Sequence, residues 1–356
     1  MKKFPILILF LAAISGCTPG TKILEDIQLI QAVGYDEMNG EEFKITAGAT
    51  YIPPGQNTEP RNLVFTSVGK TTKQIRQQIK TNSAKPIETG RVGVVLFQQE
   101  VAKNGIERHI DNYQRDANIG RDIHLVTTQG STEEILRTRY TEGDSVSQHI
   151  IDVVDQNMDH TIPDSNLHDF LSQYYAKGYD PFMPYVSKDE DQLKVLGVAL
   201  YKKDKLVDTL SLKESYILKL LYEPIRKGQF ETEWKDGRYI STENLHSHTD
   251  YKIKKERGRY HVQLTIHYNG EVSESGGMDL TKEKNIKKME REVSKAIEKK
   301  AQKLVEKFIA LGVDPIGLGE RARQQKLYDK NWEENYADLS VDVKSKVKIT
   351  QGGIIE

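Results

Sequence analysis

Apolar positions in the first half of the chain follow two different spacings. Residues 43–49 alternate apolar and polar side chains, which is the pattern of a half-buried strand, and 91–100 forms a nearly continuous apolar run. Segments 71–85 and 101–116 instead place apolar residues at helical spacing, which predicts helices between the strands. This alternation of strands and helices predicts an α/β region.

A strand predicted at 122–130 runs directly into a further helix. Ser131 followed by Glu134 fits a capping box, in which both side chains accept hydrogen bonds from backbone N–H groups at the helix N-terminus. We therefore expect this helix to begin at Ser131 and to cap itself.

The second half of the chain contains longer extended segments. A hairpin is predicted over 193–211, and Val262, Leu264, Ile266 and Tyr268 alternate with polar residues further along. The long extended segments are 229–235, 245–256, 259–274 and 341–352. We expect them to form an antiparallel sheet.

One apolar stripe predicts a helix over 281–311, with Thr281 as the candidate N-cap. Its members step by three or four positions along roughly eight turns: Ile286, Met289, Val293, Ile297, Ala301, Leu304, Phe308 and Leu311. Charged residues crowd the rest of this segment, which argues against a dimeric coiled coil. We expect the stripe to pack across the antiparallel sheet.

These patterns predict a multi-domain protein of α+β or mixed α/β class, with sheets flanked by helices. We expect an N-terminal α/β region over 23–190, long enough for two lobes, and a C-terminal α+β domain over 191–356. A boundary is therefore predicted near residue 190.

Residues 1–16 have the layout of a lipoprotein signal peptide. Two lysines precede an apolar run over 4–14, which is shorter than the about 20 residues that span a bilayer. Ile14-Ser15-Gly16-Cys17 resembles a bacterial lipobox. We therefore expect lipidation of Cys17, with 17–22 as a short tether to the folded body.

Cys17 is the single cysteine of the chain, so a disulfide within the chain is excluded. A diacylglyceryl group on its sulfur would supply two acyl chains, and stable anchoring in a lipid bilayer takes two such signals. The alternatives are an ordinary signal peptide with an incidental cysteine and a buried membrane anchor. The lipid interpretation places the protein on the exported side of a membrane.

Charge is nearly balanced along the chain. The sequence has 51 Lys and Arg against 52 Asp and Glu, and residues 1–16 hold two lysines and no acids, so the remainder carries 49 − 52 = −3. Proteins that bind nucleic acids usually carry a basic excess. We therefore expect no nucleic-acid partner.

Motifs for catalysis, metals and cofactors are absent: there is no G-x-S-x-G elbow, P-loop or H-E-x-x-H. His246 and His248 form an H-x-H pair whose side chains would share one side of a strand, a geometry that can hold a metal. His261 and His267 are the nearest other histidines, and no acid spacing completes a set. We therefore expect no metal and interpret these residues as surface or packing histidines.

Three other features have both a functional and a structural interpretation. Ser275-Gly276-Gly277 resembles part of a serine protease motif but has no identifiable base, so we expect a turn after a strand. Arg115-Asp116 and Arg121-Asp122 could clamp a ligand carboxylate or fix a loop before a strand, and we favour the loop.

Several segments carry a resemblance by their order along the chain. They start with Cys17 and Val33-Gly34-Tyr35-Asp36, continue through 112–136 and 196–215, and close with 314–353. The closing segment contains Asp314, Gly317, Gly319, Arg323 and Trp332. Over nearly the whole chain, these segments resemble the Ger(x)C family of spore germination lipoproteins, the C subunits of nutrient germinant receptors.

The resemblance implies a three-part mixed α/β architecture and no known enzymatic activity. We also expect no cofactor. It also implies a place in the spore inner membrane beside two integral-membrane partners, the A- and B-type receptor subunits, in a response to small nutrients.

Two other functions remain open. A solute-binding lipoprotein of a transporter would need two α/β lobes around a polar cleft, which the antiparallel second half disfavours. A lipid-anchored hydrolase would need a catalytic set, and none is visible in the sequence.

Overall fold

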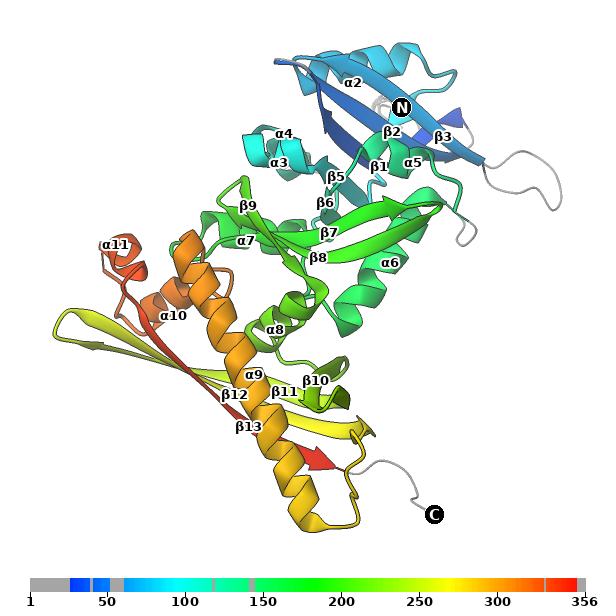
Figure 1. The fold of residues 1–356 in the computed structure, drawn as a ribbon. Coiled ribbons are helices and arrows are strands. Elements are labelled where there is room, and N and C mark those ends of the chain that lie inside the picture. The colour runs from blue at the N-terminus through cyan, green and yellow to red at the C-terminus, as the bar shows by residue number, and fades with distance from the viewer. Residues whose placement is uncertain are drawn as a thin grey trace, which may run out of the picture.

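The computed structural model describes residues 26–38, 41–51, 61–116, 119–140, 145–329 and 331–350. Within these ranges the chain forms two β-sheets, and helix α8 (Leu212–Tyr222) lies between them in Figure 1. Helix α8 contacts β8 and β9 of the first sheet and β11 of the second. Buried apolar residues of both sheets and of α8 form one continuous core.

The first sheet has the strand order β3-β2-β1-β5-β6-β7-β8-β9, with β4 beside β1. Strands β1, β5, β6 and β7 pair in parallel, and antiparallel strands complete both ends. The strands are β1 (Gln28–Glu37), β2 (Phe43–Tyr51), β3 (Arg61–Gly69), β4 (Ile87–Glu88), β5 (Val94–Gln98), β6 (His124–Thr128), β7 (Phe182–Asp189), β8 (Gln192–Lys202) and β9 (Lys205–Ser211).

Helices cover both faces of this sheet. In β5, Val95 and Phe97 join one apolar cluster, whereas Val94 and Leu96 join the other, because successive side chains point to opposite faces. The first cluster includes residues of α2 (Thr72–Thr81), α3 (Gln99–Asn104), α4 (Glu107–Arg115) and α7 (Leu167–Tyr175). The second includes residues of α5 (Thr132–Arg137), α6 (Val146–His160) and α8.

The single helix predicted over 101–116 is two helices in the structure, α3 and α4. Gly105 separates them with φ of 108°, a conformation that side-chain-bearing residues rarely adopt. A Cβ at this position would also lie 2.6 Å from Asp204 Oδ2. The glycine therefore ends α3 and lets the chain turn beneath the β8–β9 hairpin.

The β8–β9 hairpin, which we expected to open the C-terminal domain, completes the first sheet instead. Strand β7 pairs with β8 antiparallel across residue 190, in a register that runs from Phe182 opposite Leu200 to Asp189 opposite Gln192. The chain therefore passes from the first sheet to the second at α8, and not at residue 190.

The second sheet has the order β10-β11-β12-β13, formed by β10 (Gln229–Lys235), β11 (Arg238–Glu256), β12 (Arg259–Glu274) and β13 (Ser340–Thr350). The first three strands are antiparallel as predicted, but β13 pairs parallel to β12. Helix α9 (Glu283–Leu311) supplies the crossover between β12 and β13, and such a crossover returns the chain in the parallel direction.

Helix α9 confirms the long helix predicted over 281–311 and runs across the second sheet in Figure 1. Met289, Val293, Ile297, Ala301 and Phe308 of the predicted stripe are all fully buried. The predicted N-cap is wrong: the cap position is Lys282, and the hydroxyl of Thr281 donates to Asp279 instead.

Two short helices, α10 (Leu318–Gln324) and α11 (Trp332–Tyr336), lie near the end of the β11–β12 hairpin (Figure 1). Trp332 of α11 packs edge-on against Tyr260 of β12, with ring centroids 4.8 Å apart. Among the described residues, no helix has both the length and the apolar character needed to span a bilayer.

Candidate functional site

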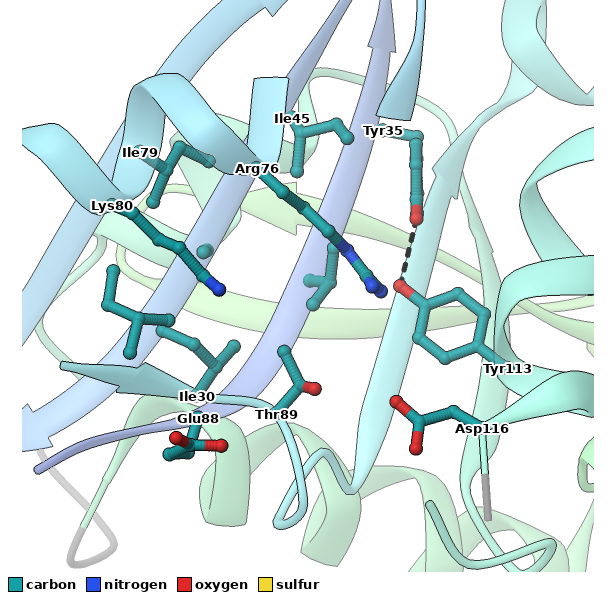
Figure 2. A pocket seen from close by; sticks show the side chains of 13 residues that line it. Ile30, Tyr35, Ile45, Arg76, Ile79, Lys80, Glu88, Thr89, Tyr113 and Asp116 are labelled. Carbon is teal, nitrogen blue, oxygen red and sulfur yellow. Dashed lines mark hydrogen bonds between the residues drawn. The ribbon is translucent and has the colours of Figure 1, made fainter. Parts of the chain in front are cut away.

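A cavity of about 260 Å³ lies between α2 and the first sheet (Figure 2). Its apolar lining comes from Ile30, Val33, Ile45, Ala47, Ile79 and Ile87. Its polar lining comes from Tyr35, Arg76, Lys80, Glu88, Thr89, Tyr113 and Asp116. An apolar cavity into which a few polar groups converge is the common form of a small-molecule site, so this is the candidate functional site.

Two tyrosines form the polar end of the cavity. The hydroxyl oxygens of Tyr35 on β1 and Tyr113 on α4 lie 2.9 Å apart, and Arg76 of α2 extends toward them (Figure 2). Burial raises the pKa of Tyr35, and it raises the pKa of Tyr113 well above its ordinary value. The hydroxyls therefore stay protonated, and because one O–H serves their mutual hydrogen bond, the other can donate elsewhere.

Groups of both charges line the cavity. Arg76 and Lys80 project from α2, and Glu88 and Asp116 lie on the opposite side of the cavity (Figure 2). Both carboxylates already interact with other groups of the chain, so a ligand would share them. A guanidinium beside a hydroxyl donor suits a carboxylate, whereas carboxylates suit a cation. The cavity can thus hold a small polar molecule that carries both charges.

His109 of α4 packs against Tyr35, one member of the tyrosine pair. Its ring is fully buried and lies 4.6 Å from the ring of Tyr35 and 4.7 Å from that of Phe43, measured between centroids. Burial, with a smaller contribution from the nearby charge of Arg108, lowers the pKa of His109 to about 3. The imidazole is therefore neutral and acts as an aromatic packing group.

The predicted residues near this cavity have mostly structural roles. Arg115 pairs with Asp111, with Nε 2.8 Å from Oδ1, one turn earlier on α4, so it does not enter the cavity. Asp116 lines the cavity and already interacts with another group of the chain. The predicted lipidation site, Cys17, lies outside the described residues.

The predicted capping box at Ser131 is wrong. Asp36 at the end of β1 caps α5 instead, because its carboxylate accepts from the backbone N–H of Thr132 at 2.7 Å and of Glu133 at 3.1 Å. The hydroxyls of Ser131 and Thr132 also donate to Asp36. Two distant segments of the family resemblance, 33–36 and 112–136, therefore meet in one structural contact.

A second contact involves the closing segment of the resemblance, which begins at Asp314. The buried carboxylate of Asp314 accepts from the backbone N–H groups of Leu318 and Gly319, at 2.9 and 2.8 Å. The backbone N–H of Asp314 in turn donates to Asp180 Oδ2 at 2.8 Å, just before β7 of the first sheet. Burial raises the pKa of Asp314 to about 7. This contact fastens the segment after α9 to the first sheet.

Away from the cavity, the H-x-H pair lies on β11 as predicted. His246 and His248 share one side of the strand, with ring centroids 5.6 Å apart. The expectation that no acid completes the set is wrong, because one donor atom each of His248, Asp250 and His267 lies within 4.8 Å of the others.

Ser275 occupies the predicted turn after β12. The backbone N–H of Met278 donates to the carbonyl of Ser275 at 3.1 Å, which closes the turn.

Both halves of the chain match known protein families. Residues 20–188 match the family described as "Spore germination protein N-terminal domain", and residues 196–353 match "Spore germination B3/ GerAC like, C-terminal". The two matches follow one another in order and leave a gap of a few residues at the start of β8.

Individual relatives agree with the family matches. The chain is 29% identical to the spore germination protein GerQC of Bacillus cereus, across 100% of both chains. It is 20% identical to the spore germination protein KC of Bacillus subtilis (strain 168), across 98% of this chain and 95% of that one.

A crystal structure of the GerBC protein has the same fold. It superposes with a TM-score of 0.61 at 19% identity, over 89% of this chain and 96% of that chain. The predicted class, a multi-domain mixture of α and β with sheets flanked by helices, is confirmed.

Proposed function

The chain belongs to the Ger(x)C family of spore germination proteins, and we propose that it is the lipid-anchored C subunit of a nutrient germinant receptor. The observation that carries this proposal is the paired family match, over 20–188 and 196–353, together with a relative that aligns over its full length. No single motif supports the assignment as strongly as this order along the chain.

In this proposal the subunit works beside A- and B-type membrane subunits on the exported side of the spore inner membrane. Cys17 carries a diacylglyceryl group, and residues 17–22 connect it to the folded body. The two acyl chains hold the protein at the bilayer surface, where it meets its partners.

The proposed role is non-catalytic. The family is not a known enzyme family, and the polar groups of the cavity suit binding better than bond cleavage. Burial keeps the hydroxyls of Tyr35 and Tyr113 protonated, so neither is a nucleophile or a base at neutral pH. The guanidinium of Arg76 offers hydrogen-bond donors and no acceptor.

A solute-binding lipoprotein of a transporter remains the second candidate, but the cavity does not favour it. Such proteins close two similar lobes around a cleft. Here the cavity lies within the first sheet and its helices, and the second sheet has a different topology.

Anchoring can be tested by Cys17→Ala in cells that produce spores. The variant cannot form the thioether, so we expect it to leave the membrane fraction and appear in the soluble fraction. Thr18→Ala is the matched control and should remain with membranes. Equal amounts of Cys17→Ala and control protein in the membrane fraction would refute the lipid anchor.

The receptor role can be tested by deleting the gene and co-purifying the protein. Spores should respond poorly to nutrients but normally to calcium dipicolinate, and the wild-type protein should co-purify with A- and B-type subunits from spore inner membrane. A normal nutrient response in a strain that also lacks paralogous C subunits, with no co-purified subunit, would refute this role.

A further inference from the structure

Three potential metal ligands converge on the face of the second sheet that α9 leaves uncovered. In β12, Leu264, Ile266 and Tyr268 enter the core beneath α9, so His267 points the opposite way. On β11, His248 pairs directly with His267, and Asp250 lies two residues further along on the same face. The antiparallel ladder thus places one aspartate and two histidines side by side.

The distances within this group are those of neighbouring ligands. His267 Nε2 lies 3.1 Å from Asp250 Oδ2, and the rings of His248 and His267 are parallel with centroids 4.6 Å apart. All three donor atoms lie within 4.8 Å of one another. Small side-chain rotations would bring them onto one ion, while the backbone ladder keeps its register.

We propose that His248, Asp250 and His267 bind a divalent transition-metal ion of the Zn²⁺ type. Two imidazole nitrogens and one carboxylate oxygen form a donor set that suits Zn²⁺, whereas Mg²⁺ and Ca²⁺ select oxygen ligands. The carboxylate also supplies negative charge, which an imidazole ligand does not bring to a metal ion. This inference is independent of the germinant-receptor proposal.

The surroundings define what the ion would do. It would join β11 to β12 across the open face, and three protein ligands leave at least one coordination position outward. His246 lies on the same side of β11, with its ring centroid 5.6 Å from that of His248. Lys346 of β13 pairs with His267, but its side chain is exposed and can extend away into water. The site therefore faces a partner or solvent and not the protein interior.

The test is calorimetric titration of the full-length, detergent-solubilised protein with ZnCl₂ after removal of metals by a chelator. Wild type should bind one Zn²⁺ per chain. His248→Ala and His267→Ala should each weaken binding by about tenfold or more, because each removes one ligand. Asp250→Asn should do the same, and because Asp250 is exposed on the surface this variant keeps the fold intact.

His261→Ala is the matched control, because His261 lies on the same exposed face of β12 as His267 but six residues earlier in the strand. It should bind Zn²⁺ as wild type does, and MgCl₂ should give no binding with any variant. Absence of saturable Zn²⁺ binding by wild type would overturn the proposal. Wild-type affinity in both His267→Ala and Asp250→Asn would overturn it as well.

Discussion

The two sheets bury their faces in different ways. In β5, the neighbours Leu96 and Phe97 are both fully buried, on opposite faces of the first sheet. In β12, Ile266 is fully buried, but the next residue, His267, keeps 30% of its side chain exposed. Parallel strands need crossovers that place helices on both faces, whereas the single crossover through α9 covers one face.

This difference decides where each half can present polar chemistry. In the first sheet, polar groups that act on a ligand must line a cavity, as Tyr35, Arg76 and Tyr113 do. In the second sheet they can stand on an open surface, as His248 and His267 do. The two halves of the chain therefore present polar groups in different settings, one enclosed by helices and one on an open sheet face.

The largest expected effects test this contrast directly. Leu96→Ala and Phe97→Ala should each lower the free energy of unfolding by about 2–5 kcal/mol, because both leave cavities in a packed core. In β12, Ile266→Ala should cost a similar amount, but Gln263→Ala on the open face should change it by less than about 0.5 kcal/mol. Urea denaturation followed by circular dichroism measures all four.

The comparison between Ile266→Ala and Gln263→Ala tests most directly whether the two faces of β12 differ in burial. If both variants of β12 were equally destabilised, the outer face would not be open in solution. A second copy of the chain covering that face would produce this result, and the effect would then depend on protein concentration.

The strands were predictable from their spacing, and so were the pairings within hairpins, but the pairing between distant strands was not. The alternation in 259–274 and the apolar run in 91–100 both became strands. The β8–β9 hairpin was predicted as a hairpin, but its antiparallel pairing with β7 in the first sheet was not predicted. That strand contains Pro184 and ends in charged residues, so its local pattern does not indicate a central position.

The proximity of His248, Asp250 and His267 could have been predicted from the sequence. Arg257 and Gly258 form a two-residue hairpin turn, both with positive φ, and this turn fixes Glu256 opposite Arg259. Counting back along both strands from that pair places His248 opposite His267. The cavity was less accessible, because Tyr35, Arg76 and Tyr113 come from separate elements that only tertiary packing brings together.

The contact that fastens the segment after α9 to the first sheet should depend on pH through Asp314. Burial raises its pKa to about 7, although the N–H groups of Gly319 and Leu318 lower it in part. Between about pH 4 and 7 the folded state keeps a proton that the unfolded state has lost. Stability should therefore fall as pH rises through this window, by up to about 1.4 kcal/mol per pH unit, and level off above it.

Asp314→Asn removes this titration and keeps an acceptor for one backbone N–H. The urea midpoints of wild type and variant can be measured from pH 4.5 to 8. Above pH 7 the two midpoints should change with pH at the same rate, and below pH 7 they should change at different rates. Parallel curves across the whole range would show that Asp314 titrates normally in the folded protein.

The core of the first sheet should respond in the opposite direction through His109. Its pKa is lowered to about 3 by burial, so below about pH 6.5 the unfolded state gains a proton that the folded state does not. Stability should fall as pH drops from 6.5 toward 4, by up to about 1.4 kcal/mol per unit. His109→Leu should abolish this dependence of stability on pH. The change in stability that Asp314 causes between about pH 4 and 7 should remain in the variant. Urea midpoints measured across the pH range would separate the two effects.

The smallest expected effect tests whether the first sheet also depends on polar contacts between its layers. Asp36→Ala removes the acceptor for two backbone N–H groups at the start of α5 and should cost about 1–2 kcal/mol. Asp36→Asn keeps one acceptor oxygen and should cost less. Ser211→Ala, which disrupts the exposed capping box of α8, provides the comparison between a buried and an exposed cap.

If Asp36→Ala costs more than Ser211→Ala, the reason is burial. Thr132 is fully buried, so its backbone N–H and hydroxyl would lose their acceptor where water cannot replace it. Ser211 is exposed, so water can take over its role. Equal costs for the two variants would mean that α5 shifts outward to rehydrate its N-terminus, and the helix layer on that face would be looser than the apolar packing indicates.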